Sequence, residues 1–399
     1  MASSLPTNRL MSLDAYRGFV MLAMASEGLG LAAVAERMSD SRVWRFLGYQ
    51  ADHVAWTGCA AWDLIQPSFL FMVGVAMPYS YASRLAQGES SLKRGAHVIY
   101  RAAILVALGV FLYSTGRPET NYTFVNTLAQ IGLAYALVYP FIGQGWRIQL
   151  GVAAAILAAY WLLFVLYPAP GPDFDWQAVG VEGDVERLTG LFAHWNKNAN
   201  FAHAFDVWFL NLFPRSEPFR FNGGGYQTLN FVPSIATMIF GLMAGELMRG
   251  PRSHAEKFWR LAAAGVTGLA IGWLLGQTVC PIVKRIWTPS WTIFSTGWTC
   301  LLLAAFFWVI DIRGWRRWAW PLVIVGMNSI AIYLLAEKAR PWIAMNLQTH
   351  LGQRVFEGQW FGRQVFDPVY EPIAHAALVL LVLWLACLWL YRQRIFVRI

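Results

Sequence analysis

Long runs without Asp, Glu, Lys or Arg set the hydrophobic pattern of this chain. The runs are 19 to 27 residues long and cover 64–83, 120–146, 148–172, 221–245, 261–283, 286–310, 318–336 and 372–391. About 20 apolar residues are enough for one helix to cross the ~30 Å hydrocarbon core of a bilayer. The pattern therefore predicts eight membrane-spanning helices.

Two further apolar segments raise this number. Residues 102–116 form a shorter run, which extends back to residue 96 if Arg101 faces inward or reaches the interface with its long side chain. The segment 13–35 is apolar but contains Asp14, Arg17 and Glu27. We therefore predict an all-α polytopic membrane protein with about ten transmembrane helices, in which residues 1–399 form a single domain.

Composition excludes several classes of protein. Of the 399 residues, 57% are hydrophobic and only 13% are charged, whereas soluble domains carry about 25% charged residues. A soluble enzyme, a disordered chain and a coiled coil are excluded on this ground, and the lipid bilayer is the expected surrounding. The net charge of +9 then indicates membrane topology, because Lys and Arg collect in cytoplasmic loops, and we expect no nucleic-acid partner.

Loop charges predict the orientation of the ten spans. On one side, short loops carry ten Lys or Arg residues and the two termini add Arg9, Arg392, Arg394 and Arg398, against six in the short connections of the other side. Both termini are thus predicted to be cytoplasmic. Two longer segments, 173–227 and 338–371, are predicted to face outward and to form an ordered cap. An acceptor cleft in this cap and plain surface loops are equally compatible with the pattern.

Ionisable residues in or beside spans are costly and are therefore candidates for function. Asp14 and Arg17 are three residues apart and share a helical face, which is also the pattern of a structural ion pair. Glu27 follows about 15 Å further along the helix axis and needs a partner if it is buried.

The second candidate group surrounds the start of the span at 64–83. His53 precedes this span and Asp63 begins it. An imidazole with a carboxylate partner can act as a general base, although a histidine before a helix is also a common interfacial residue. The sequence contains no GxSxG or HExxH motif, and we expect no metal.

Four stretches together resemble one family. They are SLDAYRGF (12–19), HVAWTGCAAWDLIQPSFLFMVG (53–74), KRIWTPSW (284–291) and GMNSIAIYLLAE (326–337), in this order along the chain. Their combination resembles the transmembrane N-acetyltransferases typified by heparan-α-glucosaminide N-acetyltransferase and its bacterial relatives.

The resemblance implies an activity and a catalytic site. Members of this family transfer an acetyl group from cytosolic acetyl-CoA to the amine of a terminal glucosamine on the far side of the membrane. The catalytic histidine of the family matches His53, and its following aspartate matches Asp63 at the same ten-residue separation. Near the end of the first helix the family has an asparagine, where this chain departs with Glu27.

Residues for acetyl-CoA follow from the same stretches and from polar positions in spans. The coenzyme carries phosphates, which Lys and Arg bind by charge and hydrogen bonds. Lys284, Arg285, Trp287 and Ser290 are candidates by family match, although the loop charges put Lys284 and Arg285 near the outer face. Arg17 beside Asp14, Arg101 and the inner loops are the alternative. Gln66, Gln130, Asn328 and Ser329 either line the coenzyme path or hydrogen-bond between helices.

Several alternatives stay open at this point. His53 is either a general base for direct transfer or a carrier that becomes acetylated. A membrane O-acyltransferase of a cell-wall or exported polysaccharide would use the same pair, and a transporter would use the intramembrane carboxylates. The compact chain resembles a bacterial form, which implies the inner membrane, and it is compatible with a homodimer.

Overall fold

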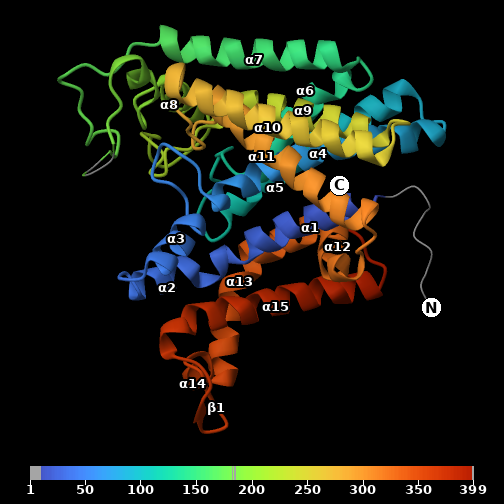
Figure 1. Ribbon diagram of the computed structural model, residues 1–399. Helices are drawn as coiled ribbons and strands as arrows, with labels where there is room; N and C mark the ends of the chain where they lie inside the picture. The colour runs from blue at the N-terminus through green and yellow to red at the C-terminus, as the bar shows by residue number, and fades with distance from the viewer. Residues whose placement is uncertain (1–9, 182, 184–185, 398–399) are drawn as a thin grey trace. The chain divides into compact units, whose positions relative to one another are not determined.

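The computed structural model describes residues 10–181, 183 and 186–397, and these are mostly helical (Figure 1). Within this part of the chain, the only regular strands are β1 (Gln359–Trp360) and β2 (Arg363–Gln364), which form a small antiparallel hairpin. Arg9 and Arg398, which entered the topology prediction, lie outside the described residues, as do positions 182, 184 and 185 of the segment 173–227.

The predicted class of an all-α polytopic membrane protein is confirmed. Among the described residues, six helices are long and apolar enough to cross a membrane, and up to eight spans result if each of two bent helix pairs counts as one. The other two of the ten predicted spans are also helical. Helix α4 (Ile65–Ala86) begins with the polar Gln66 and contains Pro78, and α6 (Thr127–Val138) is only 12 residues long.

The chain folds into two compact units. The first contains residues 1–54, 60–65 and 302–399, and the second contains residues 55–59 and 66–301. The boundary at 301 falls within helix α11 (Pro289–Phe307). The first unit thus combines the two ends of the chain, and the second is built from its middle.

In the first unit, the N-terminal helix packs among the last helices of the chain (Figure 1). Helix α1 contacts α12 and α13, and α15 contacts α12 and α13. Gly18 and Gly326 allow the close approach of α1 and α12, because a Cβ at Gly326 would stand 2.0 Å from the Asp14 carbonyl oxygen. The helices of this unit are α1 (Met11–Ala25), η1 (Glu27–Gly30), α2 (Leu31–Arg37), α3 (Arg42–Gln50), η2 (Ala61–Leu64), η6 (Trp308–Ile312), η7 (Arg317–Ala319), α12 (Trp320–Met327), α13 (Ser329–Leu351), α14 (Gln353–Phe356), η8 (Pro368–Tyr370) and α15 (Glu371–Arg392).

Two of the predicted continuous helices are broken in this unit. The segment predicted at 13–35 bends by 52° at η1, where Glu27, Leu29 and two flanking glycines adopt positive φ angles. The segment predicted at 318–336 bends by 73° at Asn328, which has non-helical angles. An asparagine side chain competes for backbone hydrogen bonds and disfavours a continuous helix. Helix α13 then runs on to Leu351, beyond the predicted end of the span.

In the second unit, α5 packs on α6, and α9 packs on α6, α7 and α10. Figure 1 shows α7 running alongside α9. The further helices of this unit are α5 (Ser91–Ser114), η3 (Tyr139–Phe141), α7 (Trp146–Leu166), η4 (Gly190–Trp195), α8 (Phe201–Leu210), η5 (Thr228–Asn230), α9 (Phe231–Arg249) and α10 (His254–Thr278).

An aromatic core orders the segment 173–227 on this unit. Trp195 is fully buried and stacks on Phe164 of α7, with ring centroids 6.2 Å apart and planes within 6°. The indole Nε1 of Trp56 donates to the Trp195 carbonyl at 2.9 Å. Aromatic pairs of this kind contribute about 0.5–1.5 kcal/mol each beyond their buried area, so this segment is a packed part of the fold.

Candidate active site

His53 and Asp63 contact each other directly in the first unit. The imidazole Nδ1 lies 2.7 Å from Asp63 Oδ1. The carboxylate is buried, with 1% of its side chain exposed, whereas 34% of the His53 side chain is exposed. The two residues therefore contact each other, so that a partly exposed ring is bonded to a buried anion.

Backbone amides hold the Asp63 carboxylate in place. Its Oδ2 accepts hydrogen bonds from the N–H groups of Ala60 at 3.0 Å and Val54 at 3.4 Å. Asp63 is the third residue of η2, so its side chain folds back over the start of this turn. Gln50 stabilises the same turn, because its Oε1 accepts a hydrogen bond from the Ala61 N–H at 2.8 Å. These bonds compensate the cost of burying a charge.

This arrangement fixes the chemistry that the imidazole can perform. When Nδ1 donates to the carboxylate, the lone pair of the neutral ring is on Nε2. The buried carboxylate also stabilises the imidazolium that forms when Nε2 takes a proton. The pair is therefore suited to general-base catalysis.

Glu27 lies at the helix break in the same unit and is paired with a cation. Its carboxylate forms an ion pair with Arg340 of α13, and the other guanidinium nitrogen of Arg340 donates to the Ala25 carbonyl at 3.2 Å. The break also contacts the segment of His53, since a Cβ at Gly28 would stand 2.7 Å from the Ala51 carbonyl oxygen. Glu27 is 63% exposed rather than buried in a continuous span, because the chain leaves the helix at this residue.

Asp14 and Arg17 form the predicted local ion pair on α1. The guanidinium lies 3.9 Å from the carboxylate of Asp14, which is largely buried. Close to this pair, the Ser12 N–H donates to Asp311 at 3.3 Å. Arg17 thus already has a carboxylate partner, which favours a structural role at this helix end over the binding of phosphates.

The second break places Asn328 and Ser329 at a helix start. Asn328 is fully buried, and its Oδ1 accepts from the Val397 N–H at 3.1 Å. Its Nδ2 is buried and has no hydrogen-bond partner among the described residues. Ser329 begins α13 and is partly buried. Broken helices expose backbone polar groups and are common at the binding sites of membrane proteins.

In the second unit, the predicted residues Lys284 and Trp287 lie on one tight turn before α11, and Ser290 lies in the first turn of that helix. Lys284 and Ser290 are buried, and Trp287 has a positive φ of 48°. The indole of Trp287 donates to Thr237 at 3.3 Å, and the Ser290 hydroxyl donates to the Pro281 carbonyl at 2.8 Å. These bonds hold the backbone of the turn.

The turn at 280–290 meets two other predicted regions within this unit. The Gly58 N–H donates to the Ile282 carbonyl at 2.9 Å. A residue of the stretch 53–74 therefore contacts this turn. Arg285 donates to the Gly224 carbonyl at 2.7 Å and stacks over Tyr226. Burial and, to a smaller extent, the charge of Arg285 lower the pKa of the Lys197 ammonium. Three cationic side chains therefore lie on or beside this turn.

The two glutamines differ in their surroundings. Gln130 is fully buried, and its amide donates to the carbonyls of Phe124 at 2.7 Å and Thr228 at 3.1 Å. The amide group thus joins two segments, while the buried Oε1 has no hydrogen-bond partner among the described residues. Gln66 is partly buried at the start of α4.

The predicted residues thus divide between the two units. Asp14, Arg17, Glu27, His53, Asp63, Asn328 and Ser329 belong to the first unit, and Gln66, Gln130, Lys284, Trp287 and Ser290 belong to the second. Sequence reasoning missed Arg340 and Lys197. Arg340 sits just beyond the GMNSIAIYLLAE motif, and Lys197 follows the buried Trp195, but neither position carries a pattern that would have identified it.

Fold and site together define a polytopic membrane protein with a histidine–carboxylate pair at the edge of a helix. Residues 9–170, which include this pair, match the family model described as the catalytic part of heparan-alpha-glucosaminide N-acetyltransferase. The resemblance drawn from the sequence motifs is confirmed.

Two curated relatives extend the similarity over most of the chain. The heparan-alpha-glucosaminide N-acetyltransferase of Mus musculus is 23% identical over 371 residues, and that of Homo sapiens is 22% identical over 376 residues. These alignments cover 82% and 83% of this chain and 53% of each relative. The chain therefore spans about half the length of the curated relatives that it matches.

Proposed function

We propose that this protein transfers an acetyl group from acetyl-CoA to the amine of a glucosamine-type sugar, with His53 as the general base and Asp63 as its partner. The observation that carries the proposal is the 2.7 Å hydrogen bond between His53 Nδ1 and Asp63 Oδ1, in a segment that matches an acetyltransferase catalytic region. An amine at neutral pH is mostly protonated, so a base at the site is a chemical requirement of this reaction.

The transfer step follows from this geometry. The ammonium form of the acceptor first releases one proton to water. Nε2 of His53 then takes a second proton from the neutral amine while its nitrogen attacks the thioester carbonyl. A carbon–nitrogen bond forms, the carbon–sulfur bond breaks, and the proton passes from the imidazolium to the leaving thiolate. Asp63 holds the ring in the required tautomer and stabilises its positive charge.

Cationic side chains of the second unit support the binding of the coenzyme phosphates. Lys284 is 4% exposed, Arg285 stacks over Tyr226, and Lys197 has a pKa lowered by burial. Ammonium and guanidinium groups that have lost part of their hydration bind phosphate oxygens more strongly than exposed ones do. This cluster, on the predicted outer side, and Arg17, at the predicted inner end, are the two candidates for the phosphates.

The proposed direction of transfer follows from the loop charges. Both termini would lie in the cytoplasm of a bacterium, where acetyl-CoA is made, and the loop with His53 would lie outside the inner membrane. An amino sugar on the outer side would then receive the acetyl group without crossing the bilayer.

The test is acetyl transfer by detergent-solubilised full-length protein. Labelled acetyl-CoA is offered with glucosamine, with an acceptor that has only hydroxyl groups, and with no acceptor. His53→Ala is compared with His350→Ala, which removes an exposed imidazole from the end of α13. We expect transfer to glucosamine by the wild type and by His350→Ala, and a loss of about 10²- to 10⁴-fold in His53→Ala.

Other outcomes would contradict the proposal in distinct ways. Transfer to hydroxyl groups alone would make the protein an O-acyltransferase. Movement of a solute into proteoliposomes without consumption of acetyl-CoA would indicate a transporter. A folded His53→Ala variant with full activity would remove His53 from the catalytic role.

A further inference from the structure

The strands β1 and β2 of the first unit form a hairpin whose tip exposes apolar side chains. The turn between the strands consists of Phe361 and Gly362. Phe361 is fully exposed, and Trp360 and Val365 beside it are 44% and 57% exposed. Apolar side chains of this size gain free energy when they leave water. These three side chains, the hairpin tip, therefore present apolar surface that the described part of the chain does not cover.

The hairpin is ordered by its own contacts. The Val365 N–H donates to the Gly358 carbonyl at 2.7 Å, and the indole of Trp360 donates to the Val355 carbonyl at 2.9 Å. The ring of Trp360 also meets that of Phe366 edge to face, with centroids 6.2 Å apart. None of these contacts uses the phenyl ring of Phe361. The hairpin is therefore held together without that ring.

The backbone at the tip is strained for a residue with a large side chain. Phe361 has a φ of 51° and Gly362 a φ of 77°, and positive values at both positions are typical of a type I′ turn. Asn, Asp and Gly favour the first of these positions, whereas other L-residues lose about 1–2 kcal/mol in a left-handed backbone. Strained residues persist where they serve a contact. Because Phe361 is fully exposed, that contact is with a partner outside the described chain.

Helix α14 ties the hairpin to the end of a membrane span. Phe356 of α14 is fully buried, and its ring centroid lies 5.2 Å from that of His375. His375 is in the second turn of α15, within a segment that is long and apolar enough to cross a membrane. Figure 1 shows α14 and β1 to the side of this end of α15 rather than beyond it. The hairpin therefore stands at the level where this span leaves the bilayer.

One face of α15 is exposed along most of the helix. Ala377, Leu381, Leu385 and Trp389 are exposed and repeat every four residues, so they form a single apolar face. In a membrane this face is covered by lipid. Lipid is therefore a partner that already borders this end of the first unit.

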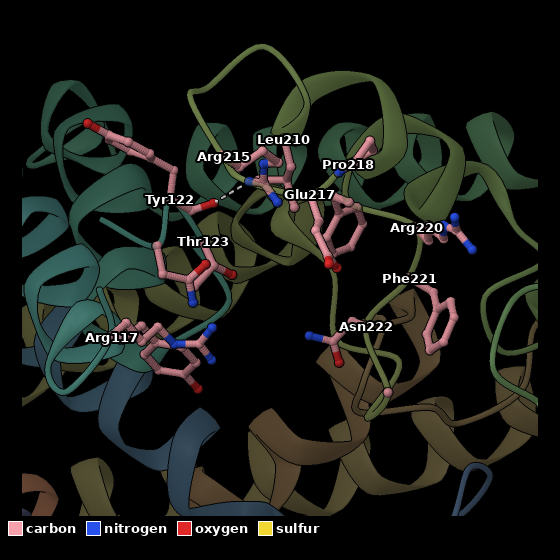
Figure 2. A pocket seen from close by; sticks show the side chains of 14 residues that line it. Arg117, Tyr122, Thr123, Leu210, Arg215, Glu217, Pro218, Arg220, Phe221 and Asn222 are labelled. Atoms are coloured by element: carbon pink, nitrogen blue, oxygen red, sulfur yellow. Dashed lines mark hydrogen bonds between the residues drawn. The ribbon is translucent and has the colours of Figure 1, made fainter. Parts of the chain in front are cut away.

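The open cavity of the second unit has a different character. It has a volume of about 900 Å³, and Figure 2 shows charged side chains around it, among them Arg117, Glu217 and Arg220. Its lining residues all belong to the second unit, and none of them belongs to the hairpin. Charged walls suit water and polar ligands rather than a phenyl ring. A lipid surface matches the hairpin tip better than a charged pocket of this kind does.

We propose that the hairpin tip inserts into the outer leaflet of the bilayer, with Phe361 below the lipid headgroups and Trp360 at their level. Aromatic rings favour this interfacial zone of a membrane, and burial of a phenyl ring there offsets the backbone strain. Arg354 and Arg363 are exposed beside the tip and suit the lipid phosphates. The tip thus anchors the connection between α13 and α15 to the membrane surface. The leaflet follows from the predicted topology, and acetyl transfer plays no part in this inference.

Spin-label accessibility measures the depth of the tip. Single cysteines for labelling replace Phe361, Leu381 or Asp173 in the full-length protein, in which Cys59→Ser removes the one native thiol that is not buried. The proteins are placed in nanodiscs of phosphatidylcholine and phosphatidylglycerol. Oxygen, which concentrates in lipid, and a water-soluble nickel complex are then compared as relaxing agents. We expect the label of Phe361→Cys to lie about 5–10 Å below the headgroup boundary.

The two other labels calibrate this measurement. Leu381→Cys carries the label on the exposed face of α15, in the middle of the span, and should give the lipid value. Asp173→Cys carries it at an exposed polar position after α7 and should give the water value. If Phe361→Cys gives the same value as Asp173→Cys, the tip lies in water and the proposal is overturned.

A second variant tests the phenyl ring itself. A label at Val365→Cys reports on the tip while Phe361→Ser removes the ring. We expect this label to become less accessible to oxygen and more accessible to nickel, because the fully exposed ring is the anchor. Phe111→Ser removes a ring of α5 that is 61% exposed and should leave the label unchanged. An unchanged label in Phe361→Ser would show that the ring does not hold the tip in lipid.

A second copy of the chain is the rival partner of the tip. A protein contact would shield the label of Phe361→Cys from oxygen and nickel alike, and dilution with unlabelled protein would reduce its dipolar broadening. That result would replace lipid by a subunit interface and overturn the proposal. If lipid covers the tip, the label stays accessible to oxygen and its spectrum does not change on dilution.

Discussion

His53 and Asp63 form a pair in which the carboxylate is 1% exposed and the imidazole is one-third exposed, with 2.7 Å between Nδ1 and Oδ1. The asymmetry matters because the buried partner is held by the N–H groups of Ala60 and Val54, while the ring can meet a ligand from outside. The backbone N–H groups fix the orientation of the carboxylate, and the partly exposed imidazole is the group that can meet a substrate.

Asp63→Asn is expected to show how much catalysis depends on the negative charge of Asp63, because the variant keeps nearly the same side-chain shape. The amide has nearly the same shape, but it cannot stabilise an imidazolium and it can hold the ring in the wrong tautomer. We expect kcat for acetyl transfer to fall about 10²- to 10⁴-fold with little change in KM. Combining this change with His53→Ala should cost little more than either alone, because the two residues act as a unit. Additive losses would show that they act separately.

The Glu27–Arg340 pair is expected to affect activity more than stability. Glu27 is mostly exposed, and exposed ion pairs contribute about 0–1 kcal/mol. However, the helix break that contains Glu27 contacts Ala51, which lies two residues before His53. Glu27→Gln and Arg340→Gln should each lower transfer about tenfold and leave the Tm nearly unchanged. Arg37→Gln, which breaks the exposed pair with Glu371, is the control and should leave transfer intact. A large fall in Tm in either test variant would instead make the pair structural.

Much of the fold follows from local sequence patterns. Each of the ten predicted spans contains a helix, because long uncharged runs admit few other structures in a bilayer. His53 and Asp63 were recognised as candidates from the sequence, but their contact depends on how the chain folds between them, which the sequence pattern does not give. The Asp14–Arg17 pair is a property of helical spacing.

The breaks and the long-range contacts could not be predicted in this way. The apolar pattern carries no signal for a bend at Glu27 or at Asn328, although Gly28 beside Glu27 was a hint. Arg340 is 313 residues away from Glu27 in sequence, and Trp195 is 139 residues away from Trp56. Pairings over such separations depend on which helices pack together, and the hydrophobic pattern does not specify this.

Gly28→Ala tests whether the helix break supports the site. Gly28 has a φ of +66°, and a Cβ there would come within 2.7 Å of the Ala51 carbonyl oxygen. Gly88 has a similar φ of +73° with open space around it, so Gly88→Ala carries the backbone strain of about 1–2 kcal/mol without the clash. We expect Gly28→Ala to lose more stability than Gly88→Ala and to lose transfer as well. Equal Tm values and full activity in both variants would show that the helix break accommodates the added Cβ at position 28 without loss.

Asp206 is expected to give the protein a pH-dependent stability. It is fully buried in α8, its Oδ2 accepts from the Thr228 N–H at 2.9 Å, and burial raises its pKa from 3.8 to about 7. The folded state therefore keeps a proton that the unfolded state loses between these values. The stabilisation by this proton is complete below about pH 4 and is lost as the pH rises through 7.

Asp206→Asn mimics the protonated form and removes this dependence. In thermal unfolding of the solubilised protein, the variant should match the wild type near pH 4.5 and exceed it at pH 8, by on the order of 5 °C. His203 titrates in both proteins, with burial lowering its pKa to about 4, so the difference between them isolates Asp206. Asp40→Asn, at an exposed position, is the control and should follow the wild type at every pH. A constant difference between Asp206→Asn and the wild type from pH 4.5 to 8 would show that Asp206 does not hold a proton in the folded state.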